Sequence, residues 1–449
     1  MKKLMAQLVL IMLLFVNNIF AQKQFLQSGP MVGYVEAREA LIWVQTNAPV
    51  DVSIEYWEKG TNKIYKLDNI RTKKQKAFVA KFICDSVLPG KIYNYAVLVN
   101  GKRLQFDYPL EFKTQELWLW RKDPPDFKFL TGSCFYVNEE YWDRPGKPYG
   151  GDYEIIKSMY NHRPDFMLWL GDNLYLREGD WNTMTGILHR YTHTRSLDVS
   201  QPFLASTPNY AIWDDHDYGP NDSDRGFWNK KATLEAFKLF WGNPSYGFYD
   251  KEAAVTYFSF YDADFFLLDN RTFRSPNDRK HIKRTILGDE QIEWLIDNLT
   301  ASKATFKFVV MGGQFLSPLP IYENYANYAE ERQKILDLIE KENIQGVIFI
   351  SGDRHHSELT KLDRPGNYPL LELTSSTITA GPNIKGCDEP NYLRVEGCCY
   401  NQRNYALVEI TGKKEERKVK FSIFGVDGKE VWSKEFKATD LRTPKSSNK

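Results

Sequence analysis

Four short apolar segments of this 449-residue chain each lead into a cluster of polar residues. Their length and composition are typical of buried strands: Phe127–Thr131, Phe166–Leu170, Tyr210–Trp213 and Val347–Ile350. The clusters that follow them are Gly132-Ser133-Cys134, Gly171-Asp172-Asn173-Leu174-Tyr175, Asp214-Asp215-His216-Asp217 and Gly352-Asp353-Arg354-His355-His356. Because ligands of an open α/β sheet bind outside the carboxyl ends of its strands, we expect all four clusters to meet in one cleft.

The side chains of these clusters are a thiol, a phenol, carboxylates and imidazoles, which together are typical of a metal site. Carboxylates suit Ca²⁺, Mg²⁺ or Mn²⁺, whereas thiolate and imidazole suit iron or zinc. The mixture predicts two or more unlike metals that share a bridging carboxylate, an arrangement that can polarise a phosphate ester. Each cluster alone has a structural alternative, a turn or a buried thiol. All four together, in a chain with only seven histidines, are hard to explain in that way.

The chain divides by pattern into a β-rich N-terminal part and a larger α/β part. Between residues 28 and 116, short segments of alternating polarity are separated by turns, which predicts a small β-sandwich. From Phe127 on, strands alternate with helices expected over residues 153–161, 289–302 and 326–342. Further strands are expected at 257–261, 265–268 and 308–311, and the tail at 404–437 returns to β structure. This alternation favours an α/β fold with parallel or mixed sheets.

The N-terminal residues have the pattern of a secretory signal peptide. Lys2 and Lys3 precede an apolar run from Leu8 to Val16, and Ala21 fits the cleavage position. The run is shorter than the ~20 apolar residues that span a membrane, and no later segment is long enough either. We therefore expect a soluble protein exported to the periplasm, the cell surface or the medium.

Two further features of composition bear on compartment and partners. The chain has 59 Lys+Arg against 58 Asp+Glu, so its net charge of +1 offers no electrostatic case for binding nucleic acid. Of its five cysteines, Cys387, Cys398 and Cys399 lie close together in sequence. We expect a disulfide from Cys387 to either Cys398 or Cys399, and a buried thiol at Cys84.

These segments resemble the alkaline phosphatase D (PhoD-like) family of the calcineurin-like metallophosphoesterase superfamily. The resemblance covers residues 28–430 or so, and its strongest mark is the cysteine of Gly132-Ser133-Cys134, because most of the superfamily has Asp-x-His there. Its other marks are Gly171-Asp172 with Tyr175, Asp214-Asp215-His216-Asp217, Leu268 to Arg274, Leu287-Gly288 with Gln291 and Trp294-Leu295, and Ser351-Gly352-Asp353 with His355. It implies a four-layer α/β (α+β) metallophosphoesterase sandwich, preceded by a small all-β domain of immunoglobulin or fibronectin type.

The resemblance also implies a set of site residues. One Fe³⁺ would be held by Cys134, Asp172, Tyr175 and His355. One or two Ca²⁺ ions would lie beside it, and Asp172 would bridge the iron and the calcium. The further calcium ligands would be Asp215 and Asp353, with Asn221 as a looser match. Other divalent metals are possible in place of these.

Two more residues are implied to contact the substrate. His216 would donate to a phosphoryl oxygen or protonate the leaving group, and Arg271 would clamp the phosphate, with a structural salt bridge as its alternative. His356 would point away from the site, because neighbouring side chains of an extended strand alternate.

The function expected from all this is hydrolysis of small phosphate mono- or diesters through a metal-bound hydroxide, by a monomer. Its domains would be a signal peptide (1–21), a β-sandwich (22–116), a linker (117–126), the catalytic domain (127–440) and a tail (441–449). One alternative is a phospholipase D-type activity on lipid headgroups, with an apolar rim at Tyr246, Phe248 and Tyr249. The other is a non-catalytic surface binding protein in which the metals only stabilise the fold.

Overall fold

The computed structural model describes residues 24–444, so the expected signal peptide at residues 1–21 lies outside the described residues. The chain forms two compact units. The first runs up to Leu117 and also takes in residues 195–208, and the second comprises residues 118–194 and 209–449. Among the described residues, none of the helices is long and apolar enough to cross a membrane.

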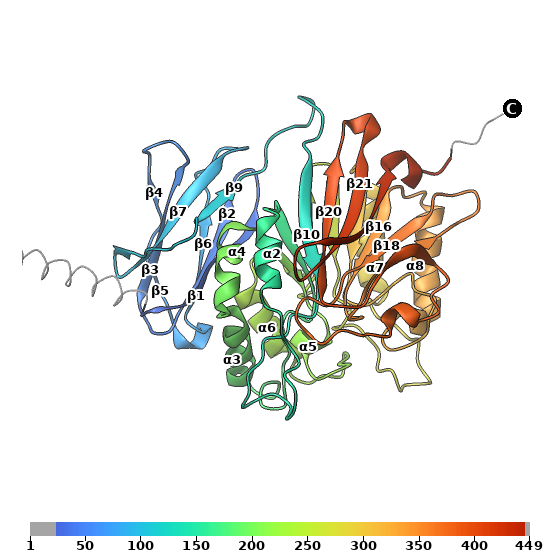
Figure 1. The fold of residues 1–449 in the computed structure, drawn as a ribbon, viewed down its shortest axis with the longest axis horizontal. Helices are drawn as coiled ribbons and strands as arrows, with labels where there is room; N and C mark the ends of the chain where they lie inside the picture. Colours follow the sequence, from blue (N-terminus) through green and yellow to red (C-terminus); the bar gives the residue numbers. More distant parts are fainter. Residues whose placement is uncertain (1–23, 445–449) are drawn as a thin grey trace, which may run out of the picture. The chain divides into compact units, whose positions relative to one another are not determined.

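The first unit is a sandwich of two antiparallel sheets (Figure 1, blue). One sheet has the order β1-β2-β6, with β1 (Leu26–Val35), β2 (Ala40–Thr46) and β6 (Val79–Cys84). The other has β3 (Asp51–Glu58) and β7 (Ile92–Val99) at its centre, flanked by the short strands β4 (Tyr65–Lys66), β5 (Ile70–Arg71), β8 (Lys102–Arg103) and β9 (Glu111–Lys113). Alternate side chains of both sheets, such as Ile42, Tyr56 and Val97, form one buried core. Cys84 belongs to this core as a free buried thiol, as predicted.

A helix from the middle of the chain completes the first unit. Helix α4 (Gln201–Ser206) packs against β1, and the side-chain oxygen of Gln201 accepts a hydrogen bond of 2.8 Å from the backbone N–H of Gly29. The sequence pattern did not predict this membership, because these residues are inserted between two segments of the second unit.

The second unit contains two sheets. The six-stranded sheet has the order β12-β11-β10-β20-β21-β22, and the seven-stranded sheet has the order β13-β14-β15-β16-β18-β17-β19. The strands of the first are β10 (Phe127–Gly132), β11 (Phe166–Leu170), β12 (Asn209–Ile212), β20 (Asn404–Thr411), β21 (Lys418–Gly425) and β22 (Glu430–Lys437). The strands of the second are β13 (Thr256–Phe260), β14 (Ala263–Leu267), β15 (Phe306–Val310), β16 (Val347–Ser351), β17 (Ser357–Leu362), β18 (Leu370–Thr374) and β19 (Arg394–Tyr400).

The two sheets pack face to face through aromatic side chains. The ring of Phe129 on β10 lies 5.3 Å from that of Phe265 on β14 and 5.6 Å from that of Phe308 on β15, both edge to face. Strands β10, β11 and β12 are parallel to one another, as are β14, β15, β16 and β18. These central strands are buried on both faces, which is why they read as continuous apolar runs.

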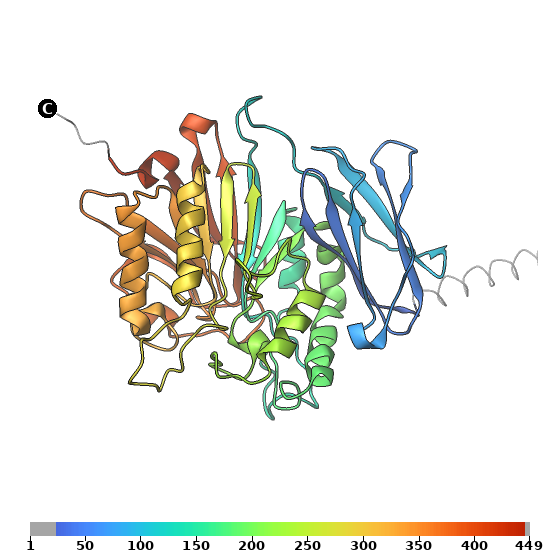
Figure 2. The ribbon, with the colours of Figure 1, turned by 180° about the vertical axis from the view of Figure 1, so that it is seen from behind.

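Helices cover the sheets from outside. Helices α7 (Asp289–Ala301) and α8 (Ala329–Lys341) lie side by side against the seven-stranded sheet, on the side away from β10 (Figures 1 and 2). The remaining helices of this unit are α2 (Ile155–Asn161), α3 (Met184–Arg195), α5 (Asp215–Tyr218) and α6 (Lys230–Phe240). Short 3₁₀ turns occur in both units. Those of the first unit are η1 (Lys74–Lys76) and η2 (Asp198–Ser200), and those of the second are η3 (Tyr325–Tyr328), η4 (Gly386–Asp388), η5 (Lys414–Glu416) and η6 (Ala438–Leu441).

Candidate metal centre

The four polar clusters meet as expected, although they follow strands of two sheets and not of one open sheet. Clusters one to three follow β10, β11 and β12 of the six-stranded sheet, and the fourth follows β16 of the seven-stranded sheet. The two sets still meet, because Ser133 after β10 pairs with Ser376 after β18 in a parallel bridge. The backbone N–H of Asp353 also donates a 3.2 Å hydrogen bond to the Ser133 hydroxyl.

Glycine is required where these strand ends approach each other. A Cβ at Gly352 would lie 2.6 Å from the Cβ of Ser133, across the two sheets. A Cβ at Gly171 would lie 2.6 Å from the Cβ of Asp214, and its φ of +91° also favours glycine. The Gly-Asp pairs in the sequence therefore mark places of close backbone approach.

The residues that follow the strands adopt unusual backbone conformations. Cys134, Asp172, Asp353 and His355 have φ angles of 60°, 49°, 65° and 55°, in the left-handed region that non-glycine residues rarely occupy. Such conformations tend to cluster at functional sites, where the surrounding structure holds them. All four are among the predicted metal ligands.

One group of candidate ligands contains a thiol, a carboxylate and an imidazole. The ligand atoms of Cys134, Asp172 and His355 all lie within 4.8 Å of one another. The Cys134 Sγ is 3.6 Å from Asp172 Oδ2, and the Tyr175 hydroxyl is 3.4 Å from His355 Nε2. The structure thus brings together the four residues for which the resemblance implied a shared iron.

The imidazole of His355 is oriented by its second nitrogen. Its Nδ1 lies 2.5 Å from the carbonyl oxygen of Gly381, which can only accept, so Nδ1 carries the proton and donates. Nε2 is then unprotonated and lies on the side of the Tyr175 hydroxyl. This is the usual arrangement of a metal-binding histidine, in which the outer N–H holds the ring in place.

A second group consists of four carboxylates and the imidazole of His216, and it shares Asp172 with the first. Asp172, Asp215 and His216 have ligand atoms within 4.8 Å of one another, as do Asp215, Asp222 and Glu323. Asp172 therefore lies between a sulfur- and nitrogen-containing group and an oxygen-rich one, which is the position of a bridging carboxylate.

Two acids of the second group were missed by sequence reasoning. Asp222 directly follows the candidate Asn221, and its backbone N–H donates a 2.7 Å hydrogen bond to Asp215 Oδ2. The pair Asn221-Asp222 could have suggested it. Glu323 lies late in the loop between β15 and η3 and not directly after a strand. No pattern in the sequence therefore pointed to it.

Burial and mutual repulsion raise the pKa values of several of these groups, whereas at Asp215 the charges of His216 and Arg271 outweigh burial and lower the pKa. Burial raises the pKa of Asp172 well above its usual range, and the charges of Asp215 and Cys134 add to the effect. Burial likewise raises the pKa of Cys134 to about 12 and that of Asp353 to about 7. Several buried acids crowded together need positive charge to ionise at neutral pH. The donor set therefore fits bound cations.

A cavity of about 590 Å³ opens onto these groups. Asp172, Asp215, His216, Asp353 and His355 line it, and so do Asn221, Asp222, Glu323, Arg354 and the exposed rings of Tyr149 and Tyr322. Tyr246, Phe248 and Tyr249 are absent from this lining. The Tyr246 hydroxyl bonds to the Trp241 carbonyl, and Phe248 is buried against Phe273 and Trp294.

Arg271 does not line the cavity. Its side chain has no exposed surface, and its guanidinium pairs with Asp214 and Glu323, with 2.5 Å from Nη2 to Glu323 Oε2. This geometry favours the structural salt bridge over the phosphate clamp, because every strong partner of the guanidinium is a carboxylate of the protein itself.

His356 points away from the cavity, as predicted, but for a different reason. Residues 353–355 are not an extended strand, since two of them have positive φ and β17 begins only at Ser357. The buried ring has its Nδ1 3.0 Å from the carbonyl oxygen of Arg354 and its Nε2 3.7 Å from Glu358. His356 therefore belongs to a structural network behind the site.

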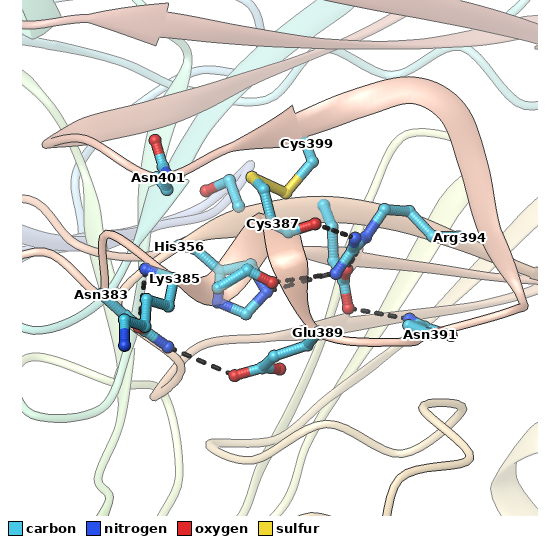
Figure 3. The surroundings of a disulfide bond; sticks show 12 residues. His356, Asn383, Lys385, Cys387, Glu389, Asn391, Arg394, Cys399 and Asn401 are labelled. Atoms are coloured by element: carbon cyan, nitrogen blue, oxygen red, sulfur yellow. Dashed lines mark hydrogen bonds and ion pairs between the residues drawn. A yellow bond between two sulfur atoms is a disulfide. The ribbon is translucent and has the colours of Figure 1, made fainter.

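That network is anchored by a disulfide between Cys387 and Cys399 (Figure 3). Cys398 remains a free buried thiol, because successive residues of strand β19 point to opposite faces. This resolves the pairing that the sequence left open.

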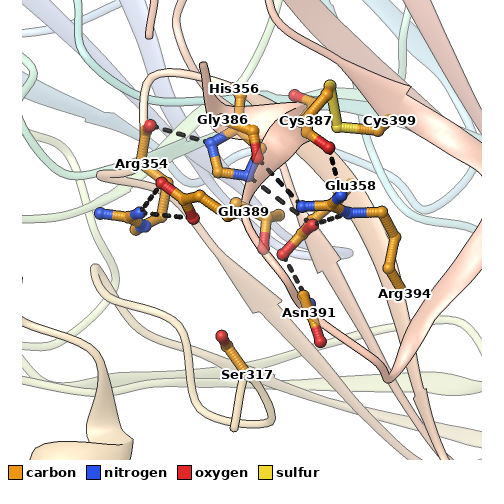
Figure 4. A network of polar contacts seen from close by, with 12 residues as sticks. Ser317, Arg354, His356, Glu358, Gly386, Cys387, Glu389, Asn391, Arg394 and Cys399 are labelled. Atoms are coloured by element: carbon orange, nitrogen blue, oxygen red, sulfur yellow. Dashed lines mark hydrogen bonds and ion pairs between the residues drawn. A yellow bond between two sulfur atoms is a disulfide. The ribbon is translucent and has the colours of Figure 1, made fainter. Parts of the chain in front are cut away.

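Two arginines contact the disulfide loop, and one of them, Arg354, also lines the cavity (Figure 4). Arg394 pairs with Glu358 and donates to the carbonyl oxygens of Gly386 and Cys387. Glu389 of the same loop receives two hydrogen bonds, of 2.7 and 2.9 Å, from Nη2 of Arg354, a residue that lines the cavity. The loop thus holds one wall of the cavity in place.

The two-sheet sandwich, with carboxylates, a thiol and imidazoles at its strand ends, defines the metallophosphoesterase class. The model of the family described as PhoD-like phosphatase matches residues 129–421, and that of a domain of unknown function (DUF7800) matches residues 23–116. The chain belongs to the PhoD-like phosphatase family.

Individual relatives agree with this assignment. The chain is 24% identical to alkaline phosphatase D of Bacillus subtilis (strain 168) over 343 residues, which are 66% of this chain and 55% of that protein. The chain thus spans about half the length of this curated relative.

Two solved structures share the fold. One, described as the structure of PhoD, superposes with a TM-score of 0.77 at 19% identity and covers 95% of this chain and 93% of its own. The other, purple acid phosphatase PPD1 from yellow lupin (Lupinus luteus) seeds, has a TM-score of 0.63 at 11% identity and covers 94% of this chain and 78% of its own.

Proposed function

We propose that this protein is an exported, metal-dependent hydrolase of phosphate mono- or diesters. The observation that carries the proposal is the position of Asp172, shared by two groups of ligand atoms that open onto one cavity. Two metals held a few ångström apart are the common means of hydrolysing phosphate esters.

We assign one Fe³⁺ to Cys134, Asp172, Tyr175 and His355, and Ca²⁺ to the oxygen-rich side. A thiolate, a phenolate and an imidazole favour iron, whereas a set of carboxylates favours calcium. The calcium ligands would be Asp172, Asp215 and Asp353, with Asn221 and the newly found Asp222 and Glu323 as further donors. When bound, such metals polarise the phosphate ester and supply a nucleophile at neutral pH.

His216 is the residue that we expect to act on the substrate directly. Its ring lies 4.2 Å from that of Tyr175, and its backbone N–H donates a 3.2 Å hydrogen bond to Asp172 Oδ1, which fixes its position on the cavity wall. Burial lowers the pKa of His216 to about 4, although the nearby Asp215 opposes the shift. The ring is then neutral at pH 7 and has one N–H to donate to a phosphoryl oxygen.

The proposed activity is tested with purified protein lacking residues 1–21. Its metals are determined by mass spectrometry, and release of p-nitrophenol is measured from p-nitrophenyl phosphate and from the bis-ester. We expect iron, calcium and hydrolysis of at least one substrate. A protein that binds both metals and cleaves neither ester would favour the non-catalytic alternative.

The ligand assignment has its own test. Cys134→Ala should lose iron and activity together, because it removes the one thiol of the ligand group. Cys84→Ala is the matched control, since it deletes an equally buried free thiol from the other unit. Full iron content in Cys134→Ala would overturn the assignment.

Export is tested separately, by fractionating cells that express the full chain and a chain without residues 1–21.

A further inference from the structure

A second cavity, of about 240 Å³, adjoins the metal cavity and shares three residues with it. The shared residues are Tyr149, His216 and Asn221. The second cavity differs in charge: Arg144, Lys147 and Arg177 line it beside one carboxylate, whereas five carboxylates and one arginine line the first.

Arg177 is a buried cation without an anionic partner among the described residues. Only 8% of its surface is exposed, and its guanidinium lies 4.8 Å from the ring centre of Tyr136 and 5.3 Å from that of Tyr175. Its Nε donates a 3.2 Å hydrogen bond to the Tyr136 hydroxyl, but within residues 24–444 it makes no ion pair. Other buried arginines of this unit each pair with a carboxylate: Arg190, Arg271, Arg274, Arg354 and Arg417.

The carboxylate of this cavity, Asp143, is engaged elsewhere. It accepts a 2.7 Å hydrogen bond from the Tyr136 hydroxyl and a 2.6 Å hydrogen bond from the backbone N–H of Glu139, and it lies 3.6 Å from Arg190. Arg144 and Lys147 are exposed, and neither forms an ion pair with any described residue. Three cations therefore face a small cavity whose acid is already neutralised.

We propose that this cavity is a subsite for a second phosphate group of the substrate. A phosphate there would provide the charge-assisted acceptors that Arg177 lacks, and planar guanidinium groups bind phosphate oxygens in pairs. His216 lies on the wall between the two cavities, so the part of the substrate that extends past His216 carries the second phosphate. The inference rests on the proposed function and names its substrate class: phosphoesters with a second phosphate on the attached alcohol.

The test measures binding without hydrolysis. Propane-1,3-bisphosphonate and propylphosphonate cannot be hydrolysed, and their dissociation constants for the metal-loaded protein are compared by isothermal titration calorimetry. We expect the bisphosphonate to bind at least about tenfold more tightly. In Arg144→Ala/Lys147→Ala this preference should fall to about threefold or less, and in Arg177→Met likewise.

The matched control removes the same charge elsewhere. Lys413→Ala/Lys414→Ala changes two exposed lysines that line neither cavity and should keep the full preference. Iron content and melting temperature of Arg177→Met are recorded too, because Arg177 contacts the candidate ligand Tyr175. If they are normal and the preference is lost, the subsite is supported.

Two outcomes would overturn the subsite. Equal affinity for both phosphonates would do so, and so would a preference that persists in all the cation variants, since the second phosphonate would then contact the metals. Failure of the proposed function is recognised independently, as absence of hydrolysis of both p-nitrophenyl phosphate and the bis-ester by metal-loaded protein.

Discussion

The buried guanidinium of Arg271 decides how the acids of the site are held together, and its replacement has a calculable effect. Its Nε lies 2.5 Å from Asp214 Oδ1 and its Nη2 lies 2.5 Å from Glu323 Oε2, with all three side chains buried. Removing one partner of a buried ion pair costs about 3–5 kcal/mol, because the remaining charge is left uncompensated. We therefore expect Arg271→Met to destabilise the second unit by this amount.

The loss of stability in Arg271→Met can be measured as a fall in melting temperature. A unit of roughly 320 residues has an unfolding entropy of about 0.67 kcal/mol/K, so the expected fall is about 4–8 °C by scanning calorimetry. Arg417→Met is the matched control, because Arg417 is also fully buried, pairs with Asp262 and lines neither cavity. Both variants should lose comparable stability.

Activity then separates the two roles of Arg271. Where Arg271→Met is folded, its kcat/KM for p-nitrophenyl phosphate should stay within about tenfold of wild type. Adding Glu323→Gln should recover part of the lost stability, because the orphaned carboxylate is neutralised. A variant that melts like wild type but loses about 10²-fold or more in kcat/KM would refute the reasoning and restore the phosphate clamp.

Three further predictions address the site and its support. His216→Ala should lower kcat by about 10²–10⁴-fold with metal content unchanged, measured by steady-state kinetics and mass spectrometry; lost metal would instead make His216 a ligand. Although burial opposes it, the neighbouring His356 and Arg394 lower the pKa of Glu358 to about 2. The stability that Glu358 adds is therefore complete above about pH 4.5 and is lost as pH falls toward 2. Melting curves of Glu358→Gln should therefore lie below wild type at pH 7 and converge with it by pH 2, and parallel curves would contradict this. Reducing the Cys387–Cys399 disulfide, whose residues are 12 apart in sequence, should cost about 3 kcal/mol, read from denaturant unfolding with and without reductant, and unchanged midpoints would speak against it.

Local pattern predicted most of the individual elements. The apolar runs before Gly132, Gly171 and Asp214 are strands β10, β11 and β12, because strands buried on both faces need continuous apolar sequence. Helix boundaries shifted where tertiary contacts compete with helical hydrogen bonds. Residues 326–328, expected to be helical, lie in the 3₁₀ turn η3, in which the Tyr328 hydroxyl bonds to the Ser275 carbonyl and to Asn277, so that α8 begins at Ala329.

Long-range pairing could not be predicted in the same way. The tail strand β20 pairs with β10, some 280 residues earlier in the chain, and so joins the tail strands to the six-stranded sheet. Residues 195–208 belong to the first unit for the same reason, because helix α4 packs against the distant strand β1. Such contacts depend on the whole packed chain and leave no mark in a local window of sequence.

The sequence by itself determined the chemistry of the candidate metal centre, because the ligand types and their places after strands are local properties of the chain. Tertiary structure decided which groups share a cation and which neutralise one another. It brought Asp222 and Glu323 to Asp215 and buried Arg271 among carboxylates, and within residues 24–444 it gave Arg177 no carboxylate partner. Charge pairing depends on distances of a few ångström between residues far apart in sequence, and only the folded chain sets those distances.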